Sequence, residues 1–423
     1  MSTITVPYSD TEKSFHIAER DLLSVFDYAG VNSPTPAQER AAVEKALANP
    51  VGTAPLTALA AGGKSVAILV DDWTRPTPAY KVLPVILQQL ADAGCADDDI
   101  SIIFAKGMHR ELSRDEMVQK AGRDVVERFE PKNHDPHENL VELGESPMGT
   151  PVLINRTVVE ADLRIAVGSV IAHPVAGYGG GAKIVVPGVA GHETIHHNHS
   201  HCNNPRVTIG CTEGNPVRAD MEDIARMAQL DLIVNTILSP RLGIIDAVSG
   251  DVVAAHREGV ERYRRIYGVK VRERADVGVV GASPRDATFG HATFALYAGA
   301  AMVQPGGSLI LVAPCRDGAG SKESRVSFRE QAAATPEVLM SKISSGEISA
   351  SGGAFMYVYS KVVNSYRVVL VSDTHSRGDA EDMGLGYGAT LQDAVDTAVA
   401  SAGADARVSV MPSGGLAVPV AAG

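Results

Sequence analysis

The chain has 423 residues, of which 45% are hydrophobic and 21% charged, so it is globular in composition and too long for one ordinary core. Its net charge of −12 argues against general nucleic-acid binding, and it has no run of 18 apolar residues and no signal-like N-terminal segment. Four widely spaced cysteines without a C-x-x-C pair argue against disulfides and thiolate zinc sites. We therefore expect a cytoplasmic protein of two domains with no membrane span.

Short apolar runs alternate with longer amphipathic segments along the chain. In the first part we expect helices at 37–48, 79–94 and 250–268, and strands at 65–70, 101–105, 163–168 and 232–238. From about residue 275 the pattern predicts the strand DVGVVGAS, a helix from about 288, a strand at 308–314, a helix near 335–346, a strand at 367–373 and a helix near 391–402. This alternation favours an α/β fold with largely parallel sheets in both halves.

The charged segment KVRERAD (270–276) is the expected hinge between the halves. We expect an N-terminal α/β domain at 1–270, which would hold the cofactor and the catalytic residues, and a C-terminal α/β domain at 275–410, which would hold the substrate pocket. The Gly- and Ala-rich residues 411–423 are expected to form a tail.

Three strands of the first half each run into polar, turn-forming residues: DDWTRPTP, KGMHR and HPVAGYGGGAK. Ligands bind outside the carboxyl ends of parallel strands, where loops converge and helix N-termini point inward. Residues from these loops are therefore expected to share one crevice: Asp72, Arg75, His109, His173 and Lys183. Each has an ordinary alternative, such as an Asp–Arg pair across a turn or a histidine that caps a helix or packs in the core.

Two motif matches in the middle of the chain are imperfect. GYGGGAKI lacks the glycine and the Ser or Thr of a phosphate loop, because Ala182 and Ile184 stand there. HETIH is a literal H-E-x-x-H, but the Pro-Gly turn before it places His192 at or before the helix start. Two alternatives nevertheless stay open: a zinc-dependent hydrolase using His192, Glu193 and His196, and a non-enzymatic nickel-binding or storage protein using the histidine cluster 192–201.

Taken together, DDWTRPTP, GMHR and HPVAGYGGGAKIVVPGVAGHETIHHNH resemble the nickel-dependent lactate racemase family, and the resemblance extends over essentially the whole chain. It implies a racemase or epimerase of 2-hydroxy acids, with the active site in the cleft between two α/β domains. The implied cofactor is a nickel-pincer nucleotide, pyridinium-3,5-bisthiocarboxylic acid mononucleotide. The implied partners are the enzymes that build and insert this cofactor and a small-molecule 2-hydroxy acid.

The resemblance also implies roles for particular residues. Lys183 would carry the cofactor as a thioamide, His199 would bind nickel, and His109 and His173 would be the catalytic acid/base pair. The glycines of the loop would let the backbone approach the cofactor phosphate: Gly179, Gly180 and Gly181. Arg75 would hold a carboxylate or phosphate, and Asp72 would fix its orientation.

The implied chemistry explains why two histidines are needed. The C2 hydrogen of a 2-hydroxy acid is poorly acidic, whereas its departure as hydride leaves a planar 2-oxo acid that can take hydride back on either face. The hydroxyl must lose its proton as the hydride leaves, so each enantiomer needs a base.

The expected substrate pocket departs from the lactate-type pattern. If Asp286 is the family's anchoring aspartate, Gly290, His291 and Phe294 stand where lactate-type members have a Tyr-Gln pair and a lysine. The family's tryptophan over the site is missing, and Phe355 or Tyr357 lies near that position. A lost ring leaves space, so we expect a substrate larger than lactate. His291 is either a substrate contact or a structural histidine.

Overall fold

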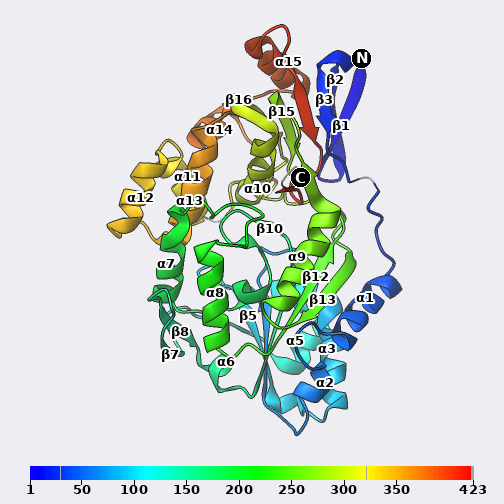
Figure 1. Cartoon of the computed structure of the whole chain (residues 1–423), viewed down its shortest axis with the longest axis vertical. Helices are drawn as coiled ribbons and strands as arrows, with labels where there is room; N and C mark the ends of the chain where they lie inside the picture. The colour runs from blue at the N-terminus through cyan, green and yellow to red at the C-terminus, as the bar shows by residue number, and fades with distance from the viewer. Residues whose placement is uncertain (29, 321, 421–423) are drawn as a thin grey trace.

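The computed structural model describes residues 1–28, 30–320 and 322–420. Two six-stranded sheets lie one above the other along the long axis (Figure 1). The lower sheet has the order β13 (Ile244–Gly250), β12 (Leu232–Leu238), β9 (Leu163–Ser169), β4 (Val66–Asp71), β5 (Ile100–Ala105), β6 (Lys132–Asn133). The upper sheet has the order β18 (Gly386–Tyr387), β17 (Arg367–Val371), β16 (Val303–Val312), β15 (Ala275–Gly281), β19 (Val408–Met411), β3 (Leu22–Val25). Neighbouring strands are parallel except β12 and β13, which confirms the expected α/β fold.

Helices cover both faces of the lower sheet. They are α1 (Pro36–Ala48), α2 (Leu56–Leu59), α3 (Ala79–Asp92), α4 (Arg114–Ala121), α5 (Arg123–Phe129), α6 (Arg156–Glu160), α7 (His192–Ser200), α8 (Pro216–Met227) and α9 (Ala254–Tyr267). Alternate residues of β4 enter different cores: Ile68 and Val70 pack with α1 and α3, whereas Ala67 and Leu69 belong to the core that includes α7, α8 and α9. Burial on both faces explains why β4 is an unbroken apolar run rather than an alternating one.

The upper half is built in the same way. Its helices are α10 (Phe289–Gly299), α11 (Lys322–Gln331), α12 (Pro336–Ser344), α13 (Ala350–Val363), α14 (Arg377–Asp382) and α15 (Leu391–Ala402). Short strand pairs and 3-10 turns complete the chain: β1 (Ser2–Tyr8) with β2 (Thr11–Ile17), β7 (Leu140–Glu145) with β8 (Pro151–Asn155), β10 (Ala172–His173) with β11 (Gly177–Tyr178), β14 (Gly268–Lys270) with β20 (Val418–Val420), and η1 (Glu19–Asp21), η2 (Asp97–Asp99), η3 (Gly181–Ile184), η4 (His201–Asn203) and η5 (Ala300–Met302). Where the sequence predicted an element, the structure has one of the same type, with ends shifted by a few residues.

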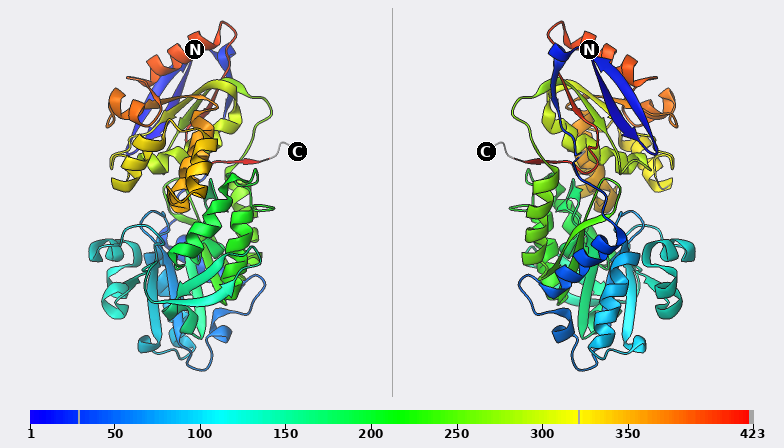
Figure 2. Two further views of the ribbon diagram at one scale, coloured as in Figure 1. Left: turned by 90° about the vertical axis from the view of Figure 1, so that its left-hand side faces the viewer. Right: turned by 90° about the vertical axis from the view of Figure 1, so that its right-hand side faces the viewer.

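The first 25 residues lie with the upper half, although they precede the whole lower sheet in the chain. β3 is the edge strand of the upper sheet beside β19, and Val6 and Phe15 of the β1–β2 hairpin pack with Val279 and Ile310. Figure 2 shows these blue strands among the red and yellow ones. The expected domain at 1–270 thus contains three strands that pack against the other half.

The expected tail at 411–423 is wrong where the structure describes it. Residues 411–418 are buried, β20 runs parallel to β14 where the two halves meet (Figure 2), and Tyr263 donates a hydrogen bond to the Leu416 carbonyl. A glycine- and alanine-rich segment can lie in the core where its backbone packs closely against neighbouring helices and strands. At Gly414, for example, a Cβ would lie only 2.3 Å from Val280 Cγ2, so a larger residue would not fit. Residues 421–423 lie outside the described residues.

Within the part of the chain that the structure describes, no helix is both long enough and apolar enough to cross a bilayer.

Candidate active site

A pocket lies at the carboxyl ends of β4, β5 and β9, as the order of parallel strands requires. It is lined by Asp71, Asp72, Arg75, Ala105, Lys106, His109, Ser169, Ile171, Gly179, Gly180, Lys183, Ile184, Pro187 and Gly188. Four of the five residues expected to share a crevice are therefore together in its wall: Asp72, Arg75, His109 and Lys183. His173 lies beside them, close enough to Lys183 and Arg75 for their positive charges to lower the pKa of its ring.

The glycine loop is shaped by close packing on its inner side. Gly180 and Gly181 have φ of 71° and 58°, in the left-handed region that favours glycine. A Cβ at Gly180 would lie 2.5 Å from Asn235 Oδ1, and a Cβ at Gly181 would lie 2.8 Å from His256 Cδ2. The Gly181 amide donates to Asn235 Oδ1 at 2.8 Å. These contacts fix the loop directly before η3, which carries Lys183.

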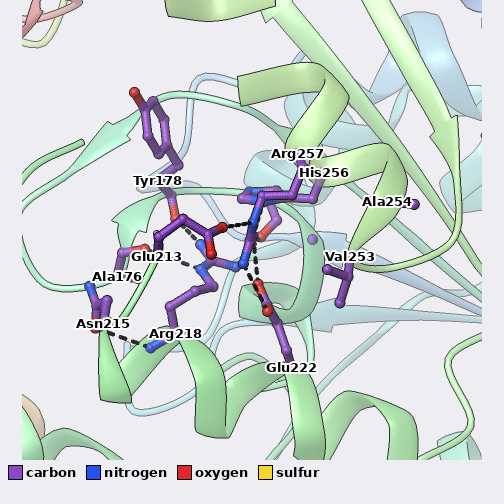
Figure 3. Close-up of polar contacts among 12 residues, drawn as sticks. Ala176, Tyr178, Glu213, Asn215, Arg218, Glu222, Val253, Ala254, His256 and Arg257 are labelled. Carbon is purple, nitrogen blue, oxygen red and sulfur yellow. Dashed lines mark hydrogen bonds and ion pairs between the residues drawn. The ribbon is translucent and has the colours of Figure 1, made fainter. Parts of the chain in front are cut away.

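Arg218 on α8 binds the carbonyls of the same loop (Figure 3). Its fully buried guanidinium donates to the carbonyls of Ala176 at 3.1 Å, Gly180 at 3.3 Å and Tyr178. From α9, His256 Nε2 donates to the Gly179 carbonyl at 2.9 Å. The loop's carbonyls are therefore held from behind by two side chains that come from distant parts of the sequence.

Lys183 is buried at the end of this loop. Burial and the nearby charges of Arg75 and Arg218 lower the pKa of its ammonium group well below the usual value. A lowered pKa favours the neutral amine, which is the nucleophilic form of lysine.

His109 is oriented by Asp72. Its Nδ1 is hydrogen-bonded to Asp72 Oδ2, while the side chain of His109 remains 45% exposed. Asp72 also accepts from the Thr74 amide at 3.1 Å and from Thr74 Oγ1 at 2.6 Å. Burial alone would raise the pKa of Asp72, but His109 and Arg75 outweigh it and hold that pKa below its usual range. Arg75 acts on Asp72 through its charge, but the hydrogen bonds of the Asp72 carboxylate go to His109 and Thr74 rather than to the Arg75 guanidinium.

His173 has the opposite hydrogen-bonding pattern. Its Nδ1 accepts the amides of Val175 and Ala176, both at 3.2 Å, so a neutral ring carries its proton on Nε2. His109 donates from Nδ1 to a carboxylate, so its Nε2 carries the free lone pair. Burial and the nearby positive charges lower the pKa of His173 well below the usual value. In this structure His109 is ready to accept a proton and His173 is ready to donate a hydrogen bond.

His199 is a buried, neutral imidazole on α7. Burial is the main cause that lowers its pKa to about 3; Lys183 adds to this fall in its protonated form, and the Ile195 carbonyl only partly offsets it. Its Nδ1 is buried and makes no hydrogen bond to any described residue. A buried neutral imidazole with an unpaired ring nitrogen suits a nickel ion, and the neutral amine favoured at Lys183 suits a covalent link. The residues present therefore fit the implied cofactor.

The other histidines of the cluster have structural contacts. His192 begins α7 and stacks on His137 with ring centroids 5.5 Å apart, Glu193 is exposed, and His196 Nδ1 accepts the Ala350 amide at 3.3 Å. Among the residues described here, no group of three His, Cys, Asp or Glu side chains is arranged to hold a metal. The zinc and storage alternatives therefore gain no support from the geometry.

Residues of the upper half complete the surroundings of the pocket. The His173 ring contacts Phe294 edge-on at 5.5 Å, Phe294 lies 6.5 Å from the Phe355 ring, and Trp73 lies 6.5 Å from His291. Burial and the charges of Arg285 and Arg75 lower the pKa of His291 to about 3, so its ring is neutral. A Cβ built at Gly290 meets nothing closer than the Ala319 carbonyl at 3.5 Å, so crowding does not impose glycine there.

Sequence reasoning missed several residues of this site. Lys106 and Trp73 stand inside quoted motifs, KGMHR and DDWTRPTP, so their position directly after strands was an available signal. Three others lie far from these motifs in the chain and carry no local signal: Arg218, His256 and Arg285.

Comparison with known proteins agrees with this architecture. Residues 8–210 match the model of the lactate racemase N-terminal domain, and residues 272–420 match that of the lactate racemase C-terminal domain. The chain is 30% identical over 429 residues to a lactate racemase of Lactiplantibacillus plantarum, covering 98% of this chain and 99% of the relative. It is 30% identical over 422 residues to a lactate racemase of Thermoanaerobacterium thermosaccharolyticum, covering 98% of each.

Solved structures give the same picture. The lactate racemase apoprotein from T. thermosaccharolyticum superposes with a TM-score of 0.89 and 29% identity, covering 99% of this chain and 100% of that one. A protein from Thermotoga maritima has a TM-score of 0.68 at 17% identity, covering 92% and 99%, and shares the fold.

Proposed function

Since this chain belongs to the lactate racemase family, we propose that it is an isomerase that racemises or epimerises a 2-hydroxy acid with a nickel-pincer nucleotide. The observation that carries the proposal is the assembly of a buried lysine, an Asp–His pair and a glycine loop in one pocket, with a second histidine beside it. The substrate would bind between this pocket and the upper-half residues that face it.

The cofactor would be held by residues of the lower half. Lys183 would form the covalent link, His199 would bind nickel, and Gly179, Gly180 and Gly181 would lie against the phosphate. When bound, the cofactor supplies an electrophilic ring that takes the C2 hydrogen of the substrate as hydride.

The two histidines would handle the hydroxyl proton. His109 Nε2 takes the proton from one enantiomer, and the resulting imidazolium is stabilised by the carboxylate of Asp72. The planar 2-oxo acid can then receive hydride on its other face. In its present form His173 carries its ring proton on Nε2, because Nδ1 accepts the Val175 and Ala176 amides. To act through Nε2 as the base for the opposite enantiomer, it must lose these two hydrogen bonds and carry the proton on Nδ1 instead. His109 needs no such change.

The fate of the C2 hydrogen tests this proposal. With 2-deuterated 2-hydroxybutyrate and cofactor-loaded chain, we expect a primary isotope effect and deuterium retained at C2 in both enantiomers, because hydride leaves and returns without entering water. Chiral chromatography with mass spectrometry measures both, and chain without cofactor is the control. Rapid loss of the label to solvent would instead indicate direct proton abstraction.

The substrate is expected to be larger than lactate. Gly290 leaves space where lactate-type members have an aromatic ring, and its surroundings do not force a glycine. Each methylene that fills such space contributes up to about 1–3 kcal/mol of discrimination. We expect kcat/KM to rise from lactate to 2-hydroxybutyrate and then to longer, aromatic or aldonic acids. A tenfold preference for lactate would show that this assignment of the pocket is wrong.

A further inference from the structure

Arg285 joins the two halves of the protein beside the proposed catalytic residues. It follows β15 in the upper half and is buried, yet its Nη1 donates to the Ala172 carbonyl of the lower half at 3.2 Å. Its guanidinium lies 3.6 Å from the centre of the Phe294 ring, and the same ring contacts His173. The Arg285 guanidinium therefore contacts Ala172, the residue before His173. It also lies against the Phe294 ring, which in turn packs on the His173 ring.

This guanidinium is only partly satisfied. Its Nη2 is buried and has no hydrogen-bond partner, and in the described part of the chain no carboxylate forms an ion pair with Arg285. A buried cationic donor without a partner has lost its hydration without gaining an acceptor, so an anionic acceptor at Nη2 would be favourable. Among the described residues the adjacent Asp286 forms no ion pair with Arg285, and its Oδ2 accepts the Ser9 amide at 3.2 Å instead.

A second guanidinium, that of the partly buried Arg75, lies close by. The charge of Arg75 is near enough to lower the pKa of Arg285, and both arginines lower the pKa of His291. Arg75 also forms no ion pair with a carboxylate among the described residues. The two like charges repel each other, so an anion bound between them would relieve the repulsion as well as satisfy Nη2.

We propose that Arg285 binds the C1 carboxylate of the substrate. This rests on the proposed function, and it assigns a carboxylate-binding residue to the upper half, whereas the sequence had made Arg75 the main candidate. A planar guanidinium matches a carboxylate with two parallel hydrogen bonds. Phe294 stands where the lactate-type pattern has a lysine, so that positive charge is absent here. The Arg285 guanidinium packs on the Phe294 ring, and it therefore supplies a positive charge on the same side of the pocket.

Binding of an unreactive acid tests the assignment without any turnover. The probe is 2-hydroxy-2-methylbutanoate, which has no C2 hydrogen, and its amide is the neutral control of nearly the same shape. Trp73, the only tryptophan of the chain, lies against His291 and reports binding by fluorescence, with calorimetry as a second measurement. In the full chain we expect the acid to bind at least tenfold more tightly than the amide.

Replacement of Arg285 should remove this preference. We expect Arg285→Met to weaken binding of the acid at least tenfold and leave binding of the amide nearly unchanged, and Arg285→Lys to give an intermediate loss because the charge stays without the fork. The exposed Arg272→Met is the matched control. Unchanged binding in a folded Arg285→Lys or Arg285→Met variant would overturn the assignment, as would equal binding of acid and amide by the unaltered chain.

Failure of this assignment is separable from failure of the proposed function. If loaded chain racemises a 2-hydroxy acid equally well with Arg285→Met, the proposed function stands and the role of Arg285 falls. If no 2-hydroxy acid is racemised but acid binding still depends on Arg285, the carboxylate site stands and the proposed reaction falls.

Discussion

Lys183→Ala is expected to lose the covalent adduct and all racemisation above the rate without enzyme. Burial and the charges of Arg75 and Arg218 favour the neutral amine at this position, and the glycine loop fixes the side chain in the pocket wall. Alanine removes the nucleophile, and Lys106, another lysine of the pocket wall, follows β5 and is not on the glycine loop. Intact-mass measurement and peptide mapping of loaded chain would show the adduct on the peptide that contains Lys183.

The matched control is Lys270→Ala, which changes an exposed lysine outside the pocket and should keep both adduct and activity. An adduct mapped to a different lysine, or full activity in Lys183→Ala, would refute the covalent link. Lys106→Met is a useful second comparison, because Lys106 lines the same pocket and should affect affinity for the cofactor without removing the attachment.

Replacing His109 or His173 with asparagine is expected to lower racemisation by about a hundredfold or more, the usual scale for loss of general-base catalysis. Racemisation needs both faces of the 2-oxo acid, so either loss should slow both directions. The first half of the reaction, oxidation of the 2-hydroxy acid to the 2-oxo acid, should distinguish the two histidines. Each variant should still oxidise one enantiomer, and the enantiomer that is oxidised should differ between the two variants. Acid quench of single-turnover mixtures measures this.

Asp72→Asn provides the control for orientation. It removes the carboxylate that holds His109 Nδ1 and leaves the hydrogen bonds of His173 in place. We expect Asp72→Asn to oxidise the same enantiomer as the His109 variant, and to lose less of the racemisation rate. If both enantiomers still give 2-oxo acid at the original rate in either histidine variant, the two-base assignment is wrong.

The sequence by itself determined the layered α/β architecture. A run such as VAILV (66–70) is apolar on both faces, and a strand covered by helices on both sides buries such a run completely. The alternation with amphipathic helices then favours parallel sheets, and parallel strands bring their carboxyl ends to one edge. For this reason five residues were predicted together: Asp72, Arg75, His109, His173 and Lys183. All of them except His173 line one pocket, and His173 lies beside it.

Tertiary structure decided the pairings that no local pattern carries. β3 joins the upper sheet beside β19, almost the full length of the chain away, and the glycine- and alanine-rich residues near the C-terminus are buried between the halves. Asp72 was expected to orient its near neighbour Arg75, but folding places it against His109. Arg218, which holds the glycine loop, and Arg285, which reaches Ala172 across the junction, come from distant segments. Sequence patterns report which face of an element is buried, whereas hydrogen-bond partners depend on which elements meet, and only the folded chain brings those elements together.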